Sequence, residues 1–224
     1  MIEELPIWVS ALFIFATVAT ILLYYFANGK AIKTASIIIL WSILQSLIAS
    51  TGFYKITETI PPRFALLLIP STLLIIYGLK SKSLSSILSQ RDPYLTTLIH
   101  TVRFPIELIL FALFTHKLVP ELMTYEGWNF DIVMGITAPF IVIMLYKKLI
   151  SEKILLAWNI IGLILILLIM IIGILSAELP FQQFGYDQPN IAVTFFPYIL
   201  LPATIVPIVI YTHITEIIRL LRKT

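Results

Sequence analysis

The chain has 224 residues, of which 59% are apolar and only 12% are charged, with a formal net charge of +3 and no cysteine. Soluble domains usually carry about 25% charged residues, so this composition excludes a soluble enzyme, a nucleic-acid-binding domain and a disordered chain. Without cysteine, disulfides and thiolate metal sites are excluded as well. We therefore predict one multi-pass membrane domain, residues 1–224, whose partners are membrane lipids and not nucleic acid.

Seven apolar stretches are long enough, or nearly long enough, to cross a bilayer as helices, which takes about 20 residues each. In chain order they are 6–27, 34–53, 64–79, 94–116, 131–146, 154–175 and 191–212. The stretches are apolar at almost every position, whereas membrane β-strands alternate, so helices are the expected structure. The fold class is thus an all-α, seven-transmembrane-helix bundle. The acidic N-terminus is unlike a cleaved signal peptide.

The basic residues predict the orientation of this bundle. Of the 15 lysines and arginines, 11 fall in the first, third and fifth connections and in the C-terminal tail. By the positive-inside rule the C-terminus is then cytoplasmic, the N-terminus is outside, and the protein is expected in the cell inner membrane. The 11 residues are Lys30, Lys33, Lys80, Lys82, Arg91, Lys147, Lys148, Lys153, Arg219, Arg222 and Lys223.

Acidic residues gather on the opposite, outer side. They include Glu3 and Glu4 at the N-terminus and the group around Glu126, Asn129 and Asp131 before the fifth stretch. Oxygen-rich loops can hold calcium, but no EF-hand spacing occurs. We therefore expect a solvated acidic rim, with no metal site.

Two short motifs suggest an internal duplication. The second and sixth stretches share a tryptophan, and the third and seventh share a proline: Trp41 with Trp158, and Pro70 with Pro202. Residues 6–79 would repeat as 131–212, with 94–116 as a linker helix. Parallel repeats of this kind occur in transporters.

This topology, with its 3+1+3 arrangement, resembles that of the SWEET sugar facilitators. The resemblance is architectural and implies no functional residue. The whole chain also resembles small uncharacterised bacterial seven-helix integral membrane proteins, which implies no activity. Microbial rhodopsins need a lysine in the last span, and residues 191–212 contain none.

The fourth stretch carries the residues best suited to chemistry. His100, Arg103 and Glu107 are spaced by three and four, so they share one helical face. A charged residue deep in a bilayer costs at least about 3 kcal/mol unless it is paired or faces a polar cavity. We expect Arg103 and Glu107 to pair at this i, i+4 spacing, so that Glu107→Ala, by leaving Arg103 unpaired, is more harmful than Arg103→Ala.

Two interpretations of this face stay open. In one it is a central binding site, in which Arg103 holds an anionic group while Glu107 and His100 carry a proton, with Gln45 and Asn159 as further polar contacts. In the other, the ion pair only locks neighbouring helices together. A haem held by His100 and a histidine at the edge of the last span, His213, is not expected, so no cofactor is predicted.

The leading functional hypothesis is that the protein binds or transports a small polar or anionic solute through this central site. An intramembrane enzyme acting on a lipid, with Glu107 and His100 as acid and base, is the alternative. A sensor or assembly partner without a substrate is a third. An enzyme of this kind should hold its polar groups near the lipid headgroups, whereas a transporter should hold them near the membrane midplane.

Overall fold

The computed structural model describes residues 5–81 and 84–222, is 73% helical, and has no strand in those ranges. Within this described part, five helical stretches are long and apolar enough to cross a membrane, which confirms an all-α protein of membrane type. They are α1 (Ile7–Ala27), α2 (Ile32–Ser50), the stretch Pro93–Thr115, α8 (Glu152–Leu175) and the stretch Leu201–Leu221. The residues Glu3, Glu4, Lys82 and Lys223, used above for orientation, lie outside the described ranges.

Helices also form in the two stretches that the sequence marks as short. The third contains α3 (Ala65–Lys80), which is followed by α4 (Leu84–Gln90), and these two qualify as a membrane span only as a pair. The fifth is α7 (Asp131–Tyr146), an apolar helix of 16 residues. Each of the seven predicted stretches therefore holds a helix, although length and composition qualify only the five above as single spans.

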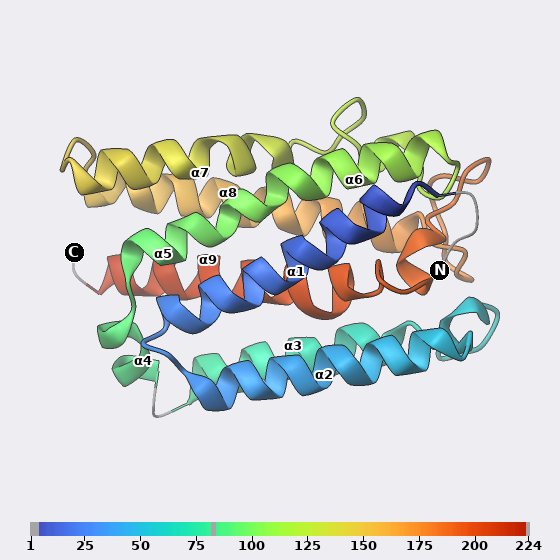
Figure 1. The fold of residues 1–224 in the computed structure, drawn as a ribbon, viewed down its shortest axis with the longest axis horizontal. Coiled ribbons are helices and arrows are strands. Elements are labelled where there is room, and N and C mark those ends of the chain that lie inside the picture. The colour runs from blue at the N-terminus through green and yellow to red at the C-terminus, as the bar shows by residue number, and fades with distance from the viewer. Residues whose placement is uncertain (1–4, 82–83, 223–224) are drawn as a thin grey trace.

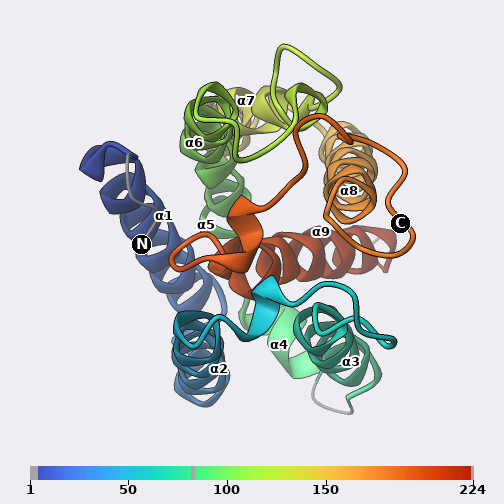
Figure 2. The same cartoon turned by 90° about the vertical axis from the view of Figure 1, so that its right-hand side faces the viewer.

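The helices lie lengthwise in one bundle, with the N- and C-termini towards opposite ends (Figure 1). Seen along the bundle, α9 (Val206–Leu221) occupies the centre and the other long helices surround it (Figure 2). Burial agrees with this picture, because 61% of the residues in the windows of Pro93–Thr115 and Leu201–Leu221 are buried, against 22% for α2 and α8. The central helices are thus the ones that can hold polar side chains away from lipid.

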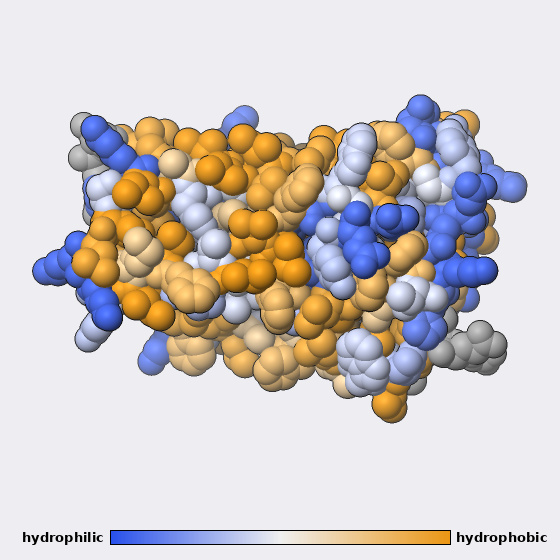
Figure 3. All heavy atoms as spheres, turned by 90° about the horizontal axis from the view of Figure 1, so that it is seen from above, coloured by the Kyte–Doolittle hydropathy of each residue, from blue (hydrophilic) through white to orange (hydrophobic). Residues whose placement is uncertain are grey.

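The surface matches a lipid-facing protein. One face shows an apolar band across the middle of the bundle and hydrophilic residues towards both ends (Figure 3). Large apolar side chains point outward from α2 and α8, including Leu40, which is 67% exposed, and Ile164, which is 59% exposed. The connections after α1 and α7 lie at the same end of the bundle as the C-terminal end of α9. We call this end the basic end and the opposite end the acidic end.

The last predicted span, 191–212, is wrong in its boundaries. The chain forms the short 3-10 helix η4 (Ala192–Thr194), a non-helical segment, a π-helical turn η5 (Leu201–Ile205) and then α9, which continues to Leu221. Pro202 and Pro207 lack the N–H groups of a regular helix, which favours an irregular start. The indole of Trp41 on α2 donates a hydrogen bond to the carbonyl of the buried residue Ala203 at 3.1 Å, which gives this acceptor a partner.

The fourth span consists of three consecutive segments: α5 (Pro93–Leu98), the 3-10 turn η2 (Ile99–Val102) and α6 (Arg103–Thr115). Asp92 caps its start by accepting hydrogen bonds from the backbone N–H groups of Tyr94 and Leu95, and Pro93 occupies the first turn, where its missing N–H costs nothing. The tighter turn and Pro105 change the local helical pitch. This irregular region holds the polar face predicted from sequence.

The connection between α6 and α7 turns back along the bundle. It contains the 3-10 helix η3 (Glu121–Met123), and α7 begins about halfway along the α5–α6 rod rather than at the end of the molecule (Figure 1). Gly127 permits the tight packing of this connection, because a Cβ there would lie 2.4 Å from the Glu121 carbonyl oxygen. As a result, Asn129 and Asp131 reach the bundle interior and are only 2% and 4% exposed.

Candidate functional site

The centre of the bundle holds a buried ion pair between α6 and α7. Arg103 donates from Nε to Asp131 Oδ2 at 2.7 Å and from Nη2 to Asp131 Oδ1. The same Nη2 donates to the Gly162 carbonyl on α8 at 3.0 Å, and Nη1 lies 3.0 Å from His213 Nε2 on α9. One guanidinium therefore ties four helices together.

This geometry fixes the tautomer of His213. A guanidinium can only donate hydrogen bonds, so His213 Nε2 must be the acceptor and the ring hydrogen must sit on Nδ1. His213 Nδ1 in turn lies 2.9 Å from Asn159 Oδ1, where it acts as the donor. The arrangement places the predicted residue Asn159 beside Arg103, linked through a histidine that the sequence puts at the membrane edge.

His100 lies in the same cluster but without a hydrogen bond. Its ring stacks on that of His213, with centroids 3.8 Å apart, and meets the Trp158 ring edge-on at 5.4 Å. The side chain is fully buried, and neither ring nitrogen has a partner among the described residues. His100 is thus packed close to the ion pair but forms no hydrogen bond to it.

The expected pair of Arg103 with Glu107 is wrong. Arg103 pairs with Asp131 instead, while Glu107 Oε1 accepts a hydrogen bond from Asn129 Nδ2 at 2.5 Å. The physical reason is the returning connection, which brings a second carboxylate to the depth of Arg103 and lets it bind with both oxygens. The residues expected in a solvated acidic rim, Asn129 and Asp131, are therefore part of the central site.

Close backbone contacts hold this site together. A Cβ on Gly162 would lie 2.4 Å from His213 Cε1, so only glycine lets α8 approach the α9 histidine ring. A Cβ on Gly135 would lie 2.3 Å from the Phe104 backbone nitrogen, so α7 packs directly against the α6 backbone. Both glycines set the helix separations on which the Arg103 hydrogen bonds depend.

A cavity of about 100 Å³ adjoins the cluster between α3, α6, α8 and α9. We call it the central cavity. Its polar lining includes Glu107, Asn129, Asp131 and Asn190, and the remaining walls are largely apolar. Glu107 is only 1% exposed, and its Oε2 has no hydrogen-bond partner among the described residues. This carboxyl oxygen is therefore available to another molecule in the cavity.

Gln45 does not join this cluster. It lies on α2, where its Oε1 accepts a hydrogen bond from the hydroxyl of Tyr54 in the 3-10 helix η1 (Phe53–Lys55). Burial raises the pKa of Tyr54 to about 12, so the hydroxyl stays protonated and remains a donor. Gln45 thus braces the connection after α2.

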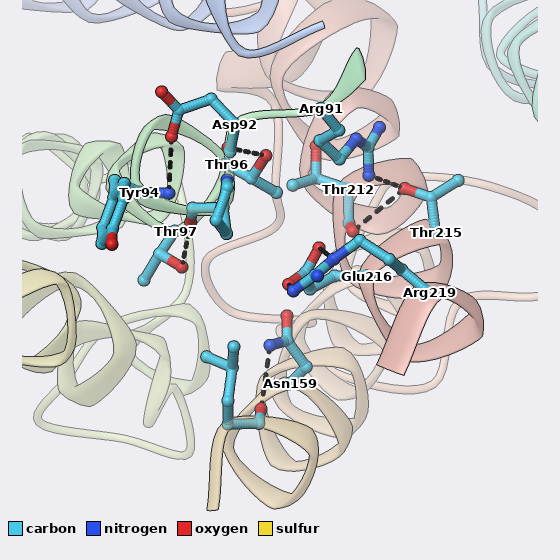
Figure 4. Close-up of polar contacts among 12 residues, drawn as sticks. Arg91, Asp92, Tyr94, Thr96, Thr97, Asn159, Thr212, Thr215, Glu216 and Arg219 are labelled. Carbon is cyan, nitrogen blue, oxygen red and sulfur yellow. Dashed lines mark hydrogen bonds and ion pairs between the residues drawn. The ribbon is translucent and has the colours of Figure 1, made fainter. Parts of the chain in front are cut away.

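A second polar cluster lies at the basic end around the buried Arg91 (Figure 4). Arg91 donates to Asn28 Oδ1 at 2.8 and 3.0 Å and to the Thr215 hydroxyl. Burial lowers its pKa. On α9, Arg219 donates to the buried Glu216 at 3.0 Å. Because each of these groups is engaged, the cluster joins α9 to the ends of α1 and α4. Within the described ranges, no three side chains of the usual metal-binding types come together to hold a metal ion.

Comparison with known families adds one decisive match. Residues 61–221 match the model of a domain of unknown function, DUF8737, and this is more than two thirds of the chain. The chain belongs to this family. No curated protein and no solved structure matches it. The matched region, residues 61–221, contains Arg103, Glu107, Asp131, Asn159 and His213, whereas Gln45 lies before it.

Two sequence signals could have located the missing site residues. The fifth apolar stretch has only 16 residues, which is shorter than the roughly 20 that a bilayer-spanning helix needs. If its C-terminal end lies at the membrane surface, its first residue, Asp131, lies inside the bilayer. The apolar spacing of Ile214, Ile217 and Leu221 continues the last helix beyond residue 212. That continuation places His213 within the bundle.

Proposed function

We propose that this member of DUF8737 is an inner-membrane protein with seven spans that binds a small polar solute in the central cavity and moves it across the membrane. The N-terminus would be outside and the C-terminus cytoplasmic. We also propose that residues 131–212 are an internal duplication of residues 6–79. The five qualifying spans, together with α3–α4 and α7, are consistent with seven crossings. The many basic residues at one end favour that end as the cytoplasmic one.

The observation that carries this proposal is a series of three adjoining cavities, of which two are lined by α3 and one by Phe64 just before α3. The acidic-end cavity, of about 170 Å³, shares Phe64 and Asn190 with the central cavity. The central cavity shares Ser71, Ile75 and Pro207 with a basic-end cavity of about 300 Å³. Neighbouring cavities therefore adjoin each other at the residues that line both. Small movements of these side chains would open a path from one end of the bundle to the other.

The depth of Glu107 favours transport over chemistry on a lipid. Glu107 lies 14 residues after Pro93 and 8 residues before Thr115 in one helical rod, which corresponds to about 21 and 12 Å at 1.5 Å per residue. It is therefore well away from either end. Solute sites of transporters lie near the midplane and use helices that begin inside the membrane. With seven crossings, α7 would be such a helix, because it begins about halfway along the α5–α6 rod (Figure 1).

Uptake of radiolabelled solutes into proteoliposomes that contain the full chain tests this proposal. We expect at least one of glycerol, urea, acetate and guanidinium to enter faster than into protein-free liposomes. We also expect Ser71→Trp to abolish the difference, because Ser71 lines both the central and the basic-end cavities.

Ser50→Trp is the matched control, because Ser50 lies on an exposed part of α2 outside these cavities. Melting temperatures of both variants check that the bundle still folds. If none of the four solutes enters faster than into protein-free liposomes, or if folded Ser71→Trp transports as well as the wild type, the proposed function is wrong.

A further inference from the structure

The polar atoms left free in the central cavity are hydrogen-bond acceptors. Glu107 Oε2 and Asn190 Oδ1 are both buried and have no hydrogen-bond partner within residues 5–81 and 84–222, and both residues line the cavity. The Asn190 amide nitrogen is held in place by the hydrogen bond that it donates to the Gly173 carbonyl at 2.9 Å, which leaves Oδ1 as the atom without a partner among the described residues. Buried acceptors without donors are costly, so a ligand that fits this cavity should bring hydrogen-bond donors.

The charges of the site point to a cation. Arg103 and Asp131 neutralise each other, so among the described residues no cation pairs with the Glu107 carboxyl, which accepts a hydrogen bond only from the neutral Asn129 amide. Arg103 is not free to attract an anion, because Asp131, Gly162 and His213 take its hydrogen bonds. A buried carboxylate is stable when a cation or a proton neutralises it.

The walls and the volume restrict the kind of cation. Most of the lining is apolar and includes the Phe64 ring, Leu68, Ile166 and Ile169. A hard inorganic cation such as calcium takes six to eight oxygen ligands, which these walls do not supply. The cavity, at about 100 Å³, is smaller than a cavity of about 150 Å³ that holds benzene. A ligand of only a few heavy atoms fits.

We propose that the central cavity binds a small organic cation with N–H donors, of the size of methylammonium or guanidinium. Glu107 Oε2 neutralises its charge and accepts one N–H bond, and Asn190 Oδ1 accepts another. When no cation is bound, a proton on Glu107 takes its place, so the site remains neutral in both states. This inference rests on the proposed function of the same cavity and names its class of solute.

Equilibrium binding of radiolabelled guanidinium to the purified full chain in detergent micelles tests the inference. We expect saturable binding that methylammonium displaces and that sodium, acetate and glycerol do not. Glu107→Gln keeps the shape of the side chain but removes its charge, and should weaken binding by about tenfold or more. Glu121→Gln, at an exposed glutamate of the connection between α6 and α7, should leave the affinity unchanged.

Asn190→Ala keeps the carboxylate and provides a second variant if Glu107→Gln does not fold; it should weaken binding by a smaller factor. The absence of saturable guanidinium binding, equal displacement by sodium, or an unchanged affinity in the folded variants would overturn the inference. If acetate or glycerol enters proteoliposomes while guanidinium does not bind, the class of solute is wrong but the proposed function stands. If guanidinium binds at Glu107 but no solute is transported, the site is right and the proposed function is wrong.

Discussion

Replacing Asp131 with alanine is expected to lower the free energy of unfolding by about 3–5 kcal/mol, the usual cost of leaving a buried charge without its partner. Arg103 is 3% exposed and cannot release its proton, so it has no way to become neutral. Of its present acceptors in the described part of the chain, it would keep the Gly162 carbonyl and the His213 ring. The melting temperature in detergent and the yield of folded protein measure the effect.

Two comparisons separate this prediction from a general loss of packing. Glu107→Ala should be milder than Asp131→Ala, because it removes an acceptor of Asn129 and leaves the Arg103 pair intact. The double variant Arg103→Met/Asp131→Leu should recover most of the stability, since an apolar pair of similar volume replaces a buried ion pair at little cost. If Glu107→Ala is the more damaging single change, the pairing described for Arg103 is incorrect.

Replacing Gly162 with alanine should destabilise the bundle by about 1–3 kcal/mol, the usual cost of overpacking a core. The new Cβ would meet His213 Cε1 at 2.4 Å and Met134 Cε at 2.5 Å, so α8 and α9 would have to separate. That separation would stretch the bond from Arg103 to the Gly162 carbonyl. Thermal unfolding of the purified variant reports the loss.

Gly173→Ala on the same helix is the matched control. Its Cβ would lie 3.3 Å from the flexible end of Met123, which can move, and alanine is the better helix former. We therefore expect Gly173→Ala to unfold at or slightly above the wild-type temperature. Equal losses in the two variants would show that the His213 contact does not set the distance between α8 and α9.

The fold was largely predictable because the signal for a membrane helix is strong. The stretches predicted at 6–27, 94–116 and 131–146 agree with α1, the α5–α6 rod and α7 to within one residue at each end. The last span failed because Pro197, Pro202 and Pro207 delay the regular helix, while its apolar face continues to Leu221. Hydropathy locates the apolar residues but does not show where prolines displace a helix along the chain.

The site was only partly predictable. Spacing on one helix brings His100, Arg103 and Glu107 together, and they do share the bundle interior. It does not reveal that Asp131 reaches Arg103 from another helix, because that contact depends on a connection that folds back along the bundle. A partner at i+4 is the best inference from one helix, whereas a bidentate carboxylate from a neighbouring helix is the better partner in three dimensions.

The most direct measurement of the central claim, that water and small solutes reach the centre of this bundle, is thiol labelling of Ser71→Cys. The native chain has no cysteine, so this single thiol is the only reactive one. In sealed proteoliposomes we expect a water-soluble, membrane-impermeant methanethiosulfonate reagent to modify it. Ile43→Cys, on the exposed apolar face of α2, should stay unmodified in lipid. If Ser71→Cys stays unmodified in the bilayer and reacts only after unfolding in SDS, the cavities do not connect to water and the claim is contradicted.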